Sequence, residues 1–338
     1  MKTRIALVLA LAGLAACAVH PRATDPMPTL PALEGEPLPP PPSEPETPGV
    51  HAPPPAAEPA PAPAAAPAAV VPAPAPAAPI VKRRIWGRVA ITTAVISPSQ
   101  LMGPEMPFAP EYKRLPVFPE RLTFDVSWGL LSVGEATLGV DKIVMFNGRP
   151  AYHLLSVARS NSFCDTFYQV RDLNESWLDA RTLTSLGYSK KLREGRYFRD
   201  VWVLYDRDAG TFVERQTSMN GSFTIKTGTI PAQVQDILSS VYYTRSRPLP
   251  DGGQVVVDVN TPENWPLTVN VVKRETVNVP LGRFSSVQVE PAMRREGLFI
   301  QKGKRLRLWM TDDAARRVLM MKVEVFFGHI TAVLREMV

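Results

Sequence analysis

The chain has 338 residues, 36 of them proline, and a formal net charge of +6 at pH 7. Twenty-two of the prolines fall within residues 18–79, and only eight follow residue 120. Because proline lacks an amide hydrogen and has a fixed φ, the proline-rich stretch cannot form regular sheet or helix. This excludes a globular N-terminal third and leaves about 220 residues, enough for one domain with a sizeable core.

Charge is divided unevenly along the chain. Residues 1–17 carry +2 and residues 18–79 carry −5, so the total of +6 leaves +9 on residues 80–338. A basic domain on an acidic tether is compatible with phosphate-rich partners such as anionic lipid or lipopolysaccharide head groups. A soluble basic surface without such a partner is the simpler alternative.

The first seventeen residues have the features of an export signal. Lys2 and Arg4 precede the apolar run Ile5–Leu14, and small residues separate that run from Cys17. The run is too short to span a bilayer as a helix, and the order of basic, apolar and small residues is typical of a secretion signal. The sequence Leu-Ala-Ala-Cys also resembles the bacterial lipobox. That resemblance implies cleavage before Cys17 and lipidation of its thiol.

The lipobox also predicts a location. Several acyl chains on Cys17 would anchor the protein stably in a membrane. Ala18 follows the cysteine, whereas lipoproteins retained in the inner membrane typically carry Asp there, so we expect the periplasmic face of the outer membrane. The alternative is an ordinary secretion signal with an incidental cysteine.

Cys164 is the only other cysteine, so lipidation of Cys17 leaves it without an intramolecular disulfide partner. Its flank, residues 162–167, alternates like a strand. No basic residue lies beside it, so we expect a buried structural thiol rather than a nucleophile.

Residues 18–79 consist mainly of Pro, Ala and Glu, a composition that favours polyproline II and cannot bury a core. We therefore expect a disordered tether, which would reach at most about 190 Å if fully extended. Residues 80–119 are expected to be a transitional basic linker, and residues 120–338 the folded domain.

From residue 120 onward the hydrophobic period is two. Leu122, Phe124, Val126 and Trp128 alternate with polar residues, as in a strand with one buried face. The same period recurs at residues 152–158, 197–205, 255–259, 267–271, 306–310 and 318–326. Turn signals separate these runs, at residues 147–148, 220–221, 251–253, 281–282 and 327–328. The pattern predicts an all-β fold, one large antiparallel sheet curled into an unclosed or half β-barrel.

One segment, residues 232–247, has helical spacing instead. It follows Pro231 and ends before Pro248. Its apolar positions are Val234, Ile237, Leu238, Val241 and Tyr242. A single amphipathic helix in an all-β chain is normally used to cover the concave face of a sheet, and we predict that position here.

Two charged residues of this segment are expected to anchor it. Asp236 and Arg245 are nine positions apart, about two and a half helical turns, so they point to nearly opposite sides and do not pair with each other. We expect each to bind a strand, with Glu275 or Glu290 as the partner of Arg245.

Several motifs together resemble the bacterial exported family called domain of unknown function 3108. They include Leu122–Trp128 with Ser132–Leu138, Asp236–Arg245, Lys273–Val277, Gly282–Phe284 with Val289–Pro291, and Trp309–Asp313 with Phe327–Leu334. The resemblance covers residues 115–338. It implies an exported β-rich domain with no established activity. The architecture is also similar to the unclosed β-barrel of lipoprotein-carrier proteins, which hold acyl chains under a helix.

No residue pattern indicates catalysis, a cofactor or a metal. His153 and His329 lack the neighbours of a zinc or iron signature. Asp312 and Asp313 are adjacent, so on a strand they would point to opposite faces. We expect Thr311 and Asp312 to cap a short turn over residues 313–316 instead.

Aromatic and basic residues are the remaining candidates for binding. The predicted ligand site is a cavity under the helix lined by Trp128, Ile237, Val241, Tyr242, Arg245 and Trp309, although a sheet core uses the same residue types. Basic and aromatic residues also interleave at residues 190–199. For an exported protein an anionic lipid or glycan is a more sensible partner for these cations than nucleic acid.

The sequence therefore predicts an outer-membrane lipoprotein with a non-enzymatic β-domain that binds a lipidic or anionic envelope component in a concave sheet. Lipid, lipopolysaccharide and glycan are the candidate ligands. The alternative is an envelope structural or assembly protein that docks a protein partner through a sheet edge or the proline-rich arm.

Replacing the predicted lipidation site tests the anchor. The Cys17→Ala variant is expected to move from the membrane fraction to the soluble fraction, because it loses every acyl chain. Cell fractionation with mass spectrometry of the N-terminal peptide measures this. Equal membrane association of the variant and the parent chain would contradict lipid anchoring at Cys17.

Overall fold

The computed structural model describes residues 96–261, 263–293, 305–325 and 327–338. The lipobox at Cys17, the predicted tether at residues 18–79 and the first part of the linker lie outside the described residues. Among the residues it describes, no helix is long and apolar enough to cross a membrane.

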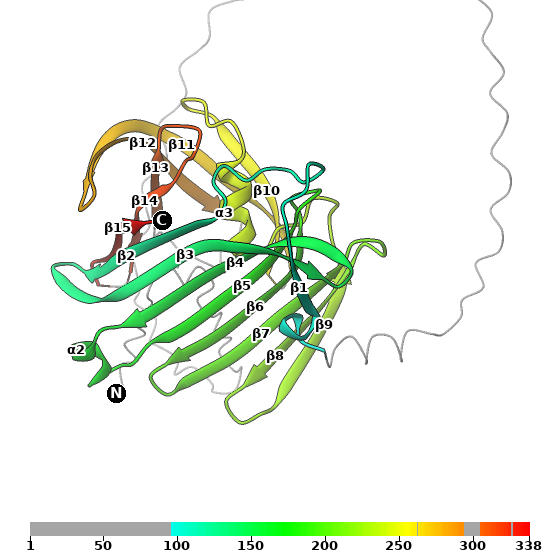
Figure 1. The fold of residues 1–338 in the computed structure, drawn as a ribbon. Coiled ribbons are helices and arrows are strands. Elements are labelled where there is room, and N and C mark those ends of the chain that lie inside the picture. Colours follow the sequence, from blue (N-terminus) through cyan, green and yellow to red (C-terminus); the bar gives the residue numbers. More distant parts are fainter. Residues whose placement is uncertain (1–95, 262, 294–304, 326) are drawn as a thin grey trace, which may run out of the picture. The chain divides into compact units, whose positions relative to one another are not determined.

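The described residues form one antiparallel sheet of fifteen strands (Figure 1). The strands are β1 (Met102–Met106), β2 (Glu120–Trp128), β3 (Leu131–Phe146), β4 (Arg149–Ser160), β5 (Arg171–Asp179), β6 (Ser185–Glu194), β7 (Tyr197–Asp206), β8 (Thr211–Ser218), β9 (Phe223–Thr229), β10 (Gln254–Asn260), β11 (Asn264–Val279), β12 (Gly282–Met293), β13 (Leu306–Thr311), β14 (Val318–Glu324) and β15 (His329–Met337). The helices are the 3-10 helix η1 (Pro98–Leu101), α2 (Ser162–Asp165) and α3 (Ile237–Arg245).

The strand order is β10-β11-β12-β13-β14-β15-β2-β3-β4-β5-β6-β7-β8-β9. Two meanders, β2 to β9 and β10 to β15, are thus joined where β15 pairs with β2, with Ile330 opposite Trp128. The end strands β9 and β10 do not pair with each other. The sheet curls without closing (Figure 1), which confirms the predicted all-β fold.

The turn signals fall between strands as expected. Asn147 and Gly148 form the two-residue connection between β3 and β4, and their φ angles are 46° and 78°. A type I′ turn requires positive φ at both central residues, which Asn and Gly tolerate best. This local chemistry fixes the register of the longest hairpin in the first meander.

Part of the expected linker belongs to the sheet. β1 pairs with the C-terminal part of β3, with Met102 opposite Phe146. Leu101 and Met102 pack against a buried cluster that includes Phe146 and Trp177. Ile143 belongs to the main core and Val144 to this second cluster, and neighbouring side chains on a strand point to opposite faces. The second cluster therefore lies on the outer face of the sheet.

α3 lies against the concave face, as predicted, and packs on β4, β5 and β10. It is shorter than the expected helix of residues 232–247, because the preceding residues pair with strands. Gln235 forms a parallel bridge with Val259 on β10. The carbonyl of Val234 accepts a hydrogen bond from the amide of Ser185 on β6. These contacts join the β10 edge to the other half of the sheet.

The C-terminus of α3 is fixed by a buried ion pair. Arg245 Nη1 and Nη2 donate to Glu120 Oε2 and Oε1 at 2.6 and 2.7 Å, and both side chains are 0% exposed. Arg245 also donates to the carbonyl of Ala315 at 3.1 Å. Glu120 begins β2, so this pair ties the helix to the strand at which the two meanders meet.

The predicted partners of Arg245 were wrong. Glu275 accepts a hydrogen bond from Trp309 Nε1 at 2.7 Å, and Glu290 pairs with Arg307 at 3.4 Å. Both carboxylates are bound to neighbours within their own meander. The helix end reaches the start of β2 instead.

Replacing Arg245 tests how much this ion pair contributes to stability. The Arg245→Met variant is expected to lose about 3 kcal/mol of stability, because Glu120 stays buried and the described residues leave it Arg317, at 3.7 Å, as its one remaining cation partner. The double variant Arg245→Met/Glu120→Leu should recover most of that loss. The exposed pair of Arg335 with Asp125 is the control, since Arg335→Met should cost less than about 1 kcal/mol. Urea unfolding measures the stability of each variant. Equal losses of stability in Arg245→Met and Arg335→Met would contradict a special role for the buried ion pair.

Candidate functional site

The N-terminus of α3 is held by a buried carboxylate. Asp236 Oδ2 accepts hydrogen bonds from the hydroxyls of Ser176 on β5 and Ser185 on β6, each at 2.6 Å. Its Oδ1 accepts the amides of Leu238 and Ser239. Burial raises the pKa of Asp236, and these hydrogen bonds oppose the rise. The prediction that Asp236 anchors the helix to strands is confirmed.

Four of the six predicted ligand-site residues lie on α3. Ile237 is 6% exposed and Tyr242 0%, both within the main core, and Val241 is partly buried against it. Arg245 pairs with Glu120 and lies 5.1 Å from the Tyr242 ring centroid. These side chains come together as the packing of the helix on the sheet.

The two predicted tryptophans make their polar contacts elsewhere. Trp128 ends β2, about 26 Å along the strand from Glu120. Its Nε1 donates to the carbonyl of Phe327 at 2.7 Å. Trp309 on β13 donates to Glu275 on β11. Trp309 belongs to the main core that also contains Ile237 and Tyr242, and Trp128 packs against that core, but neither indole N–H bonds to α3.

The adjacent aspartates do not converge. Asp313 Oδ1 accepts the hydroxyl of Thr311 and the amides of residues 315 and 316, and Asp312 pairs with Arg274. Asp313 therefore caps the turn, and the prediction that Asp312 does so was wrong. The side chains point to different partners because they follow one another directly at the end of β13.

His153 has two carboxylate neighbours. Its Nδ1 lies 3.1 Å from Asp141 Oδ1, and its Nε2 lies 3.2 Å from Glu175 Oε1. The hydrogen bond from His153 lowers the pKa of Glu175. The part of the chain that the structure describes contains no group of three or more His, Cys, Asp or Glu residues placed to hold a metal.

Cys164 is buried, as predicted, and burial raises the pKa of its thiol. It lies in α2 and not in a strand. Asn161 caps that helix, with its side-chain oxygen accepting the amide of Cys164 at 2.9 Å. The alternation of residues 162–167 was misleading because a four-residue helix is too short to show its own period.

A buried polar stripe on β5 and β6 was missed by the sequence analysis. Asp172, Asn174 and Ser176 alternate along β5 and are 1%, 4% and 0% exposed. Lys190 on β6 lies opposite Asn174 and is 4% exposed. Lys190 is therefore not the surface cation that the basic stretch of residues 190–199 suggested. On most strands the inward positions are hydrophobic, and that pattern identifies them in the sequence. On β5 the inward positions are polar, so the pattern does not reveal which face is buried.

The stripe ends in two neighbouring acidic groups, Asp172 and Glu194. Burial, and next the charge of Asp172, raise the pKa of Glu194 to about 7. Lys190 and Tyr168 act in the opposite direction. Burial also raises the pKa of Asp172. At neutral pH this end of the sheet therefore carries less negative charge than its composition indicates.

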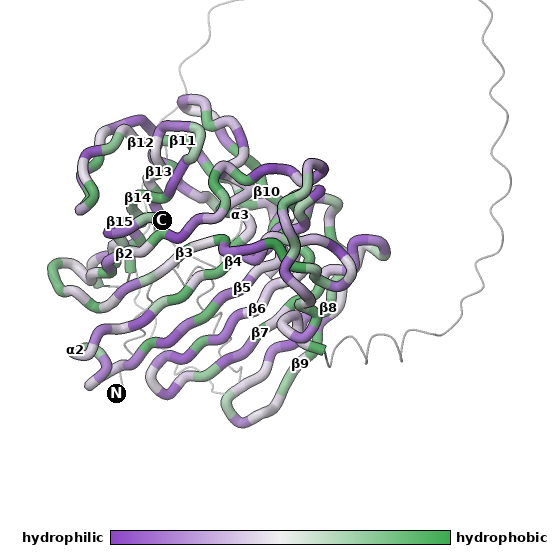
Figure 2. The backbone as a smooth tube through the Cα atoms, in the orientation of Figure 1, coloured by the Kyte–Doolittle hydropathy of each residue, from purple (hydrophilic) through white to green (hydrophobic). Residues whose placement is uncertain are grey.

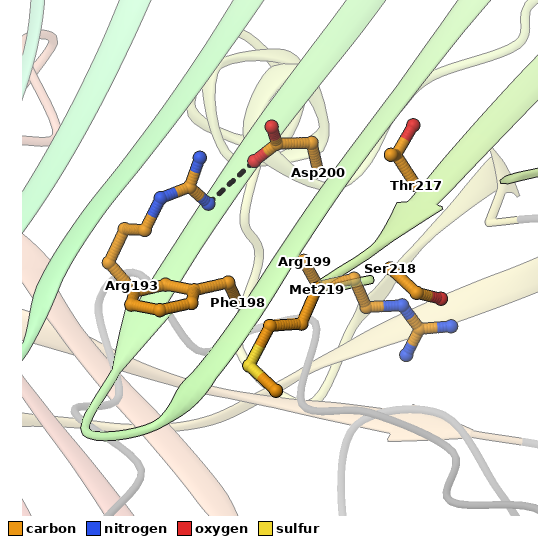
Figure 3. A pocket seen from close by; sticks show the side chains of 7 residues that line it. All are labelled: Arg193, Phe198, Arg199, Asp200, Thr217, Ser218 and Met219. Atoms are coloured by element: carbon orange, nitrogen blue, oxygen red, sulfur yellow. Dashed lines mark hydrogen bonds and ion pairs between the residues drawn. The ribbon is translucent and has the colours of Figure 1, made fainter. Parts of the chain in front are cut away.

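An open pocket of about 270 Å³ lies at the ends of β6, β7 and β8 (Figure 3). Its lining residues are Arg193, Phe198, Arg199, Asp200, Thr217, Ser218 and Met219. The first four fall in or beside the basic and aromatic stretch that the sequence analysis identified. The last three come from β8 and the turn after it.

The pocket combines cations with apolar surface. Arg193 Nη1 pairs with Asp200 Oδ1 at 2.6 Å, and Arg193 Cζ lies 5.5 Å from the Phe198 ring centroid (Figure 3). Arg199 Nη1 donates to the Tyr197 hydroxyl at 3.2 Å. Arg193 and Asp200 offset each other's charge, and Arg199, which alternates with Phe198 and Asp200 along β7, extends away from Arg193 and contributes its cation at the other side of the lining (Figure 3). Such a lining can bind an anionic group beside a short apolar segment.

The raised pKa of Glu194 predicts a pH dependence of stability. Its folded pKa of about 7 exceeds the ordinary value of 4.5, so folding takes up a proton between these values. The contribution of Glu194 to the free energy of unfolding is therefore fully present below pH 4.5 and is lost as pH rises through 7. The Glu194→Gln variant should show a smaller decline over that window than the parent chain in urea unfolding. Glu135→Gln, at a half-exposed position on β3, is the matched control; parallel profiles for all three proteins would contradict the assignment.

Comparison with known proteins gives one family match. The family model described as "Protein of unknown function (DUF3108)" matches residues 123–335. Among solved structures, a beta-barrel-like protein of domain of unknown function DUF1849 from Brucella abortus is 11% identical, with a TM-score of 0.44. A putative exported protein with a YmcC-like fold from Bacteroides fragilis is 10% identical, with a TM-score of 0.26. Each alignment covers 67% of this chain and 99% of the other.

No curated protein matches the chain. The family model spans most of the described sheet, from β2 to β15. It also includes Asp236 and Arg245, the two residues that fix the ends of α3. Apart from Leu122, the motifs that suggested the resemblance fall within the matched range, and the chain belongs to the family of proteins of unknown function called DUF3108.

Proposed function

We propose that this domain is a non-enzymatic binding module of the bacterial cell envelope that accepts the head of an anionic amphiphile. The observation that carries the proposal is the pocket of Figure 3, in which Arg193 lies beside Phe198 and whose lining also includes Arg199 and Met219. The side chains of Phe198 and Met219 are 43% and 65% exposed. Exposed apolar side chains beside arginines suit a ligand with an acidic head and an apolar chain.

The size of the pocket limits what it holds. A volume of about 270 Å³ is slightly below the usual range for drug-sized ligands, about 300–1,000 Å³. It suits a head group with the first part of an acyl chain rather than a whole lipid. This differs from the cavity under α3 that the sequence predicted, where the packed side chains of Tyr242 and Ile237 occupy the core.

The proposed location is the periplasmic face of the outer membrane, with an acyl anchor at Cys17. The lipobox and Ala18 support it. The net charge of +9 on residues 80–338 also favours an anionic envelope component as the partner. Lipopolysaccharide and glycan acids share this chemistry with phospholipids.

A protein-docking role is the alternative, and β9 favours it. This strand ends the sheet, and Phe223 and Ile225 are 54% and 45% exposed. An unpaired strand edge can accept a strand from a partner by β-augmentation. β9 is seven residues long, which is enough for such pairing. An envelope assembly protein would use this edge.

Two amphiphiles with the same chain length test the pocket. Dodecyl phosphate is expected to bind the parent chain more tightly than dodecyl maltoside, because only the phosphate engages the arginines. The double variant Arg193→Gln/Arg199→Gln should weaken dodecyl phosphate binding at least about tenfold, since a charge-assisted hydrogen bond contributes about 1.5–3 kcal/mol. Titration calorimetry measures both ligands.

Arg335→Gln, which removes an exposed arginine on β15, is the matched control and should bind like the parent chain. Equal affinity of the parent chain for the two amphiphiles, or an unchanged affinity in the double variant, would refute a pocket for anionic head groups.

A further inference from the structure

Five connections lie along one edge of the sheet (Figure 1). They join β14 to β15, β2 to β3, β4 to β5, β6 to β7 and β8 to β9. These ten strands are consecutive neighbours in the antiparallel order, so the connections all fall at the same ends of the strands. Each connection can therefore meet one external surface together with its neighbours.

Large exposed hydrophobic residues concentrate in these five connections. Among the described residues, sixteen large hydrophobic side chains are exposed, and nine of them lie either in these connections or within the first two residues of the strands that follow them. They are Phe327, Leu130, Leu131, Phe163, Phe167, Tyr197, Phe198, Met219 and Phe223. We call this set the tip row. The exposed fraction is highest at Leu130, 106%, and Phe167, 79%, and Figure 2 shows the β2–β3 turn as hydrophobic.

The connection between β4 and β5 is built to present its side chains. Phe163 and Phe167 pack edge to face on each other, with ring centroids 5.7 Å apart. The loop around them is held by the salt bridge of Asp165 with Arg171 at 2.5 Å and by the Asn161 cap of α2. Two large apolar rings are thus held at the surface by polar contacts beneath them.

Cations accompany the tip row. Arg159 and Arg196 are exposed beside it, and Arg199 lines the pocket behind it. The nearby carboxylates of Asp165, Asp200 and Glu135 are paired with Arg171, Arg193 and Arg335. Glu194, at the end of β6, has a pKa raised to about 7 and so carries only part of a negative charge at neutral pH. The edge is therefore apolar at its tips and net positive just behind them. This is the charge arrangement that complements an anionic head-group layer.

We infer that the tip row docks on an anionic lipid bilayer, with its apolar side chains inserted between head groups and its arginines at the phosphates. The tips are separate turns rather than one continuous patch, and a fluid lipid surface accepts separate side chains one by one. A protein partner would instead need a contiguous complementary surface. This surface comprises all five connections and does not depend on ligand binding in the pocket.

Vesicle sedimentation tests the inference with the full chain carrying Cys17→Ser, so that no acyl anchor contributes. The protein is expected to bind vesicles of phosphatidylcholine with phosphatidylglycerol and to bind phosphatidylcholine vesicles much more weakly. Two tip variants, Phe163→Ser/Phe167→Ser and Leu130→Ser/Leu131→Ser, should each lower the partition coefficient at least about tenfold. Because these side chains are exposed, circular dichroism should show that both variants keep the parent fold.

The matched control removes exposed apolar residues away from the tip row. Val256 on β10 and Leu281 in the β11–β12 turn are 51% and 41% exposed. The Val256→Ser/Leu281→Ser variant should partition like the parent chain. The proposal is overturned by tip variants that bind vesicles as well as the parent chain does. It is also overturned if the tip substitutions abolish binding of a protein partner while vesicle binding stays unchanged. The Phe163→Ser/Phe167→Ser variant separates this proposal from the pocket, because it should weaken vesicle binding and still bind dodecyl phosphate like the parent chain; neither residue lines the pocket.

Discussion

Two buried charged groups, one at each end of α3, are the constraint on which the rest of the structure depends. Asp236 binds the hydroxyls of β5 and β6, and Arg245 binds Glu120 at the start of β2. The helix spans about 13 Å between them. Because a buried charge without its partner costs several kcal/mol, the sheet can curl only as far as both partners stay in place. The helix thereby sets the curvature of the strands that lie between its two contacts.

That curvature separates two regions with different chemistry. Near α3, Gln235 pairs with β10, and Tyr205 on β7 donates to the carbonyl of Asn260, so the two halves of the sheet meet there. Away from the helix the pocket lies at the ends of β6, β7 and β8, and the strands end in the tip row. The packed region supplies stability, and the open edge supplies the surface and charge that a binding role needs.

The sequence predicted the strands whose two faces differ. Leu122, Phe124 and Val126 alternate because one face of β2 packs on the core. The same method failed for β5, where Asp172 and Ser176 point inward, and for β9, which is exposed on both faces. The partner of Arg245 lies 125 positions away, so no local pattern could identify it. Likewise, residues 190–199 indicated one wall of the pocket, but the contribution of β8 depends on sheet register.

The central claim, that the open edge of this sheet serves an anionic envelope amphiphile, is tested most directly on the protein taken from its own membranes. Mass spectrometry of the molecules that co-purify with the intact chain measures both lipids and proteins in one experiment. The account predicts an acidic lipid or other anionic amphiphile in a constant ratio to the protein. Recovery of no lipid, together with one protein in stoichiometric amount, would contradict it and favour docking through the β9 edge.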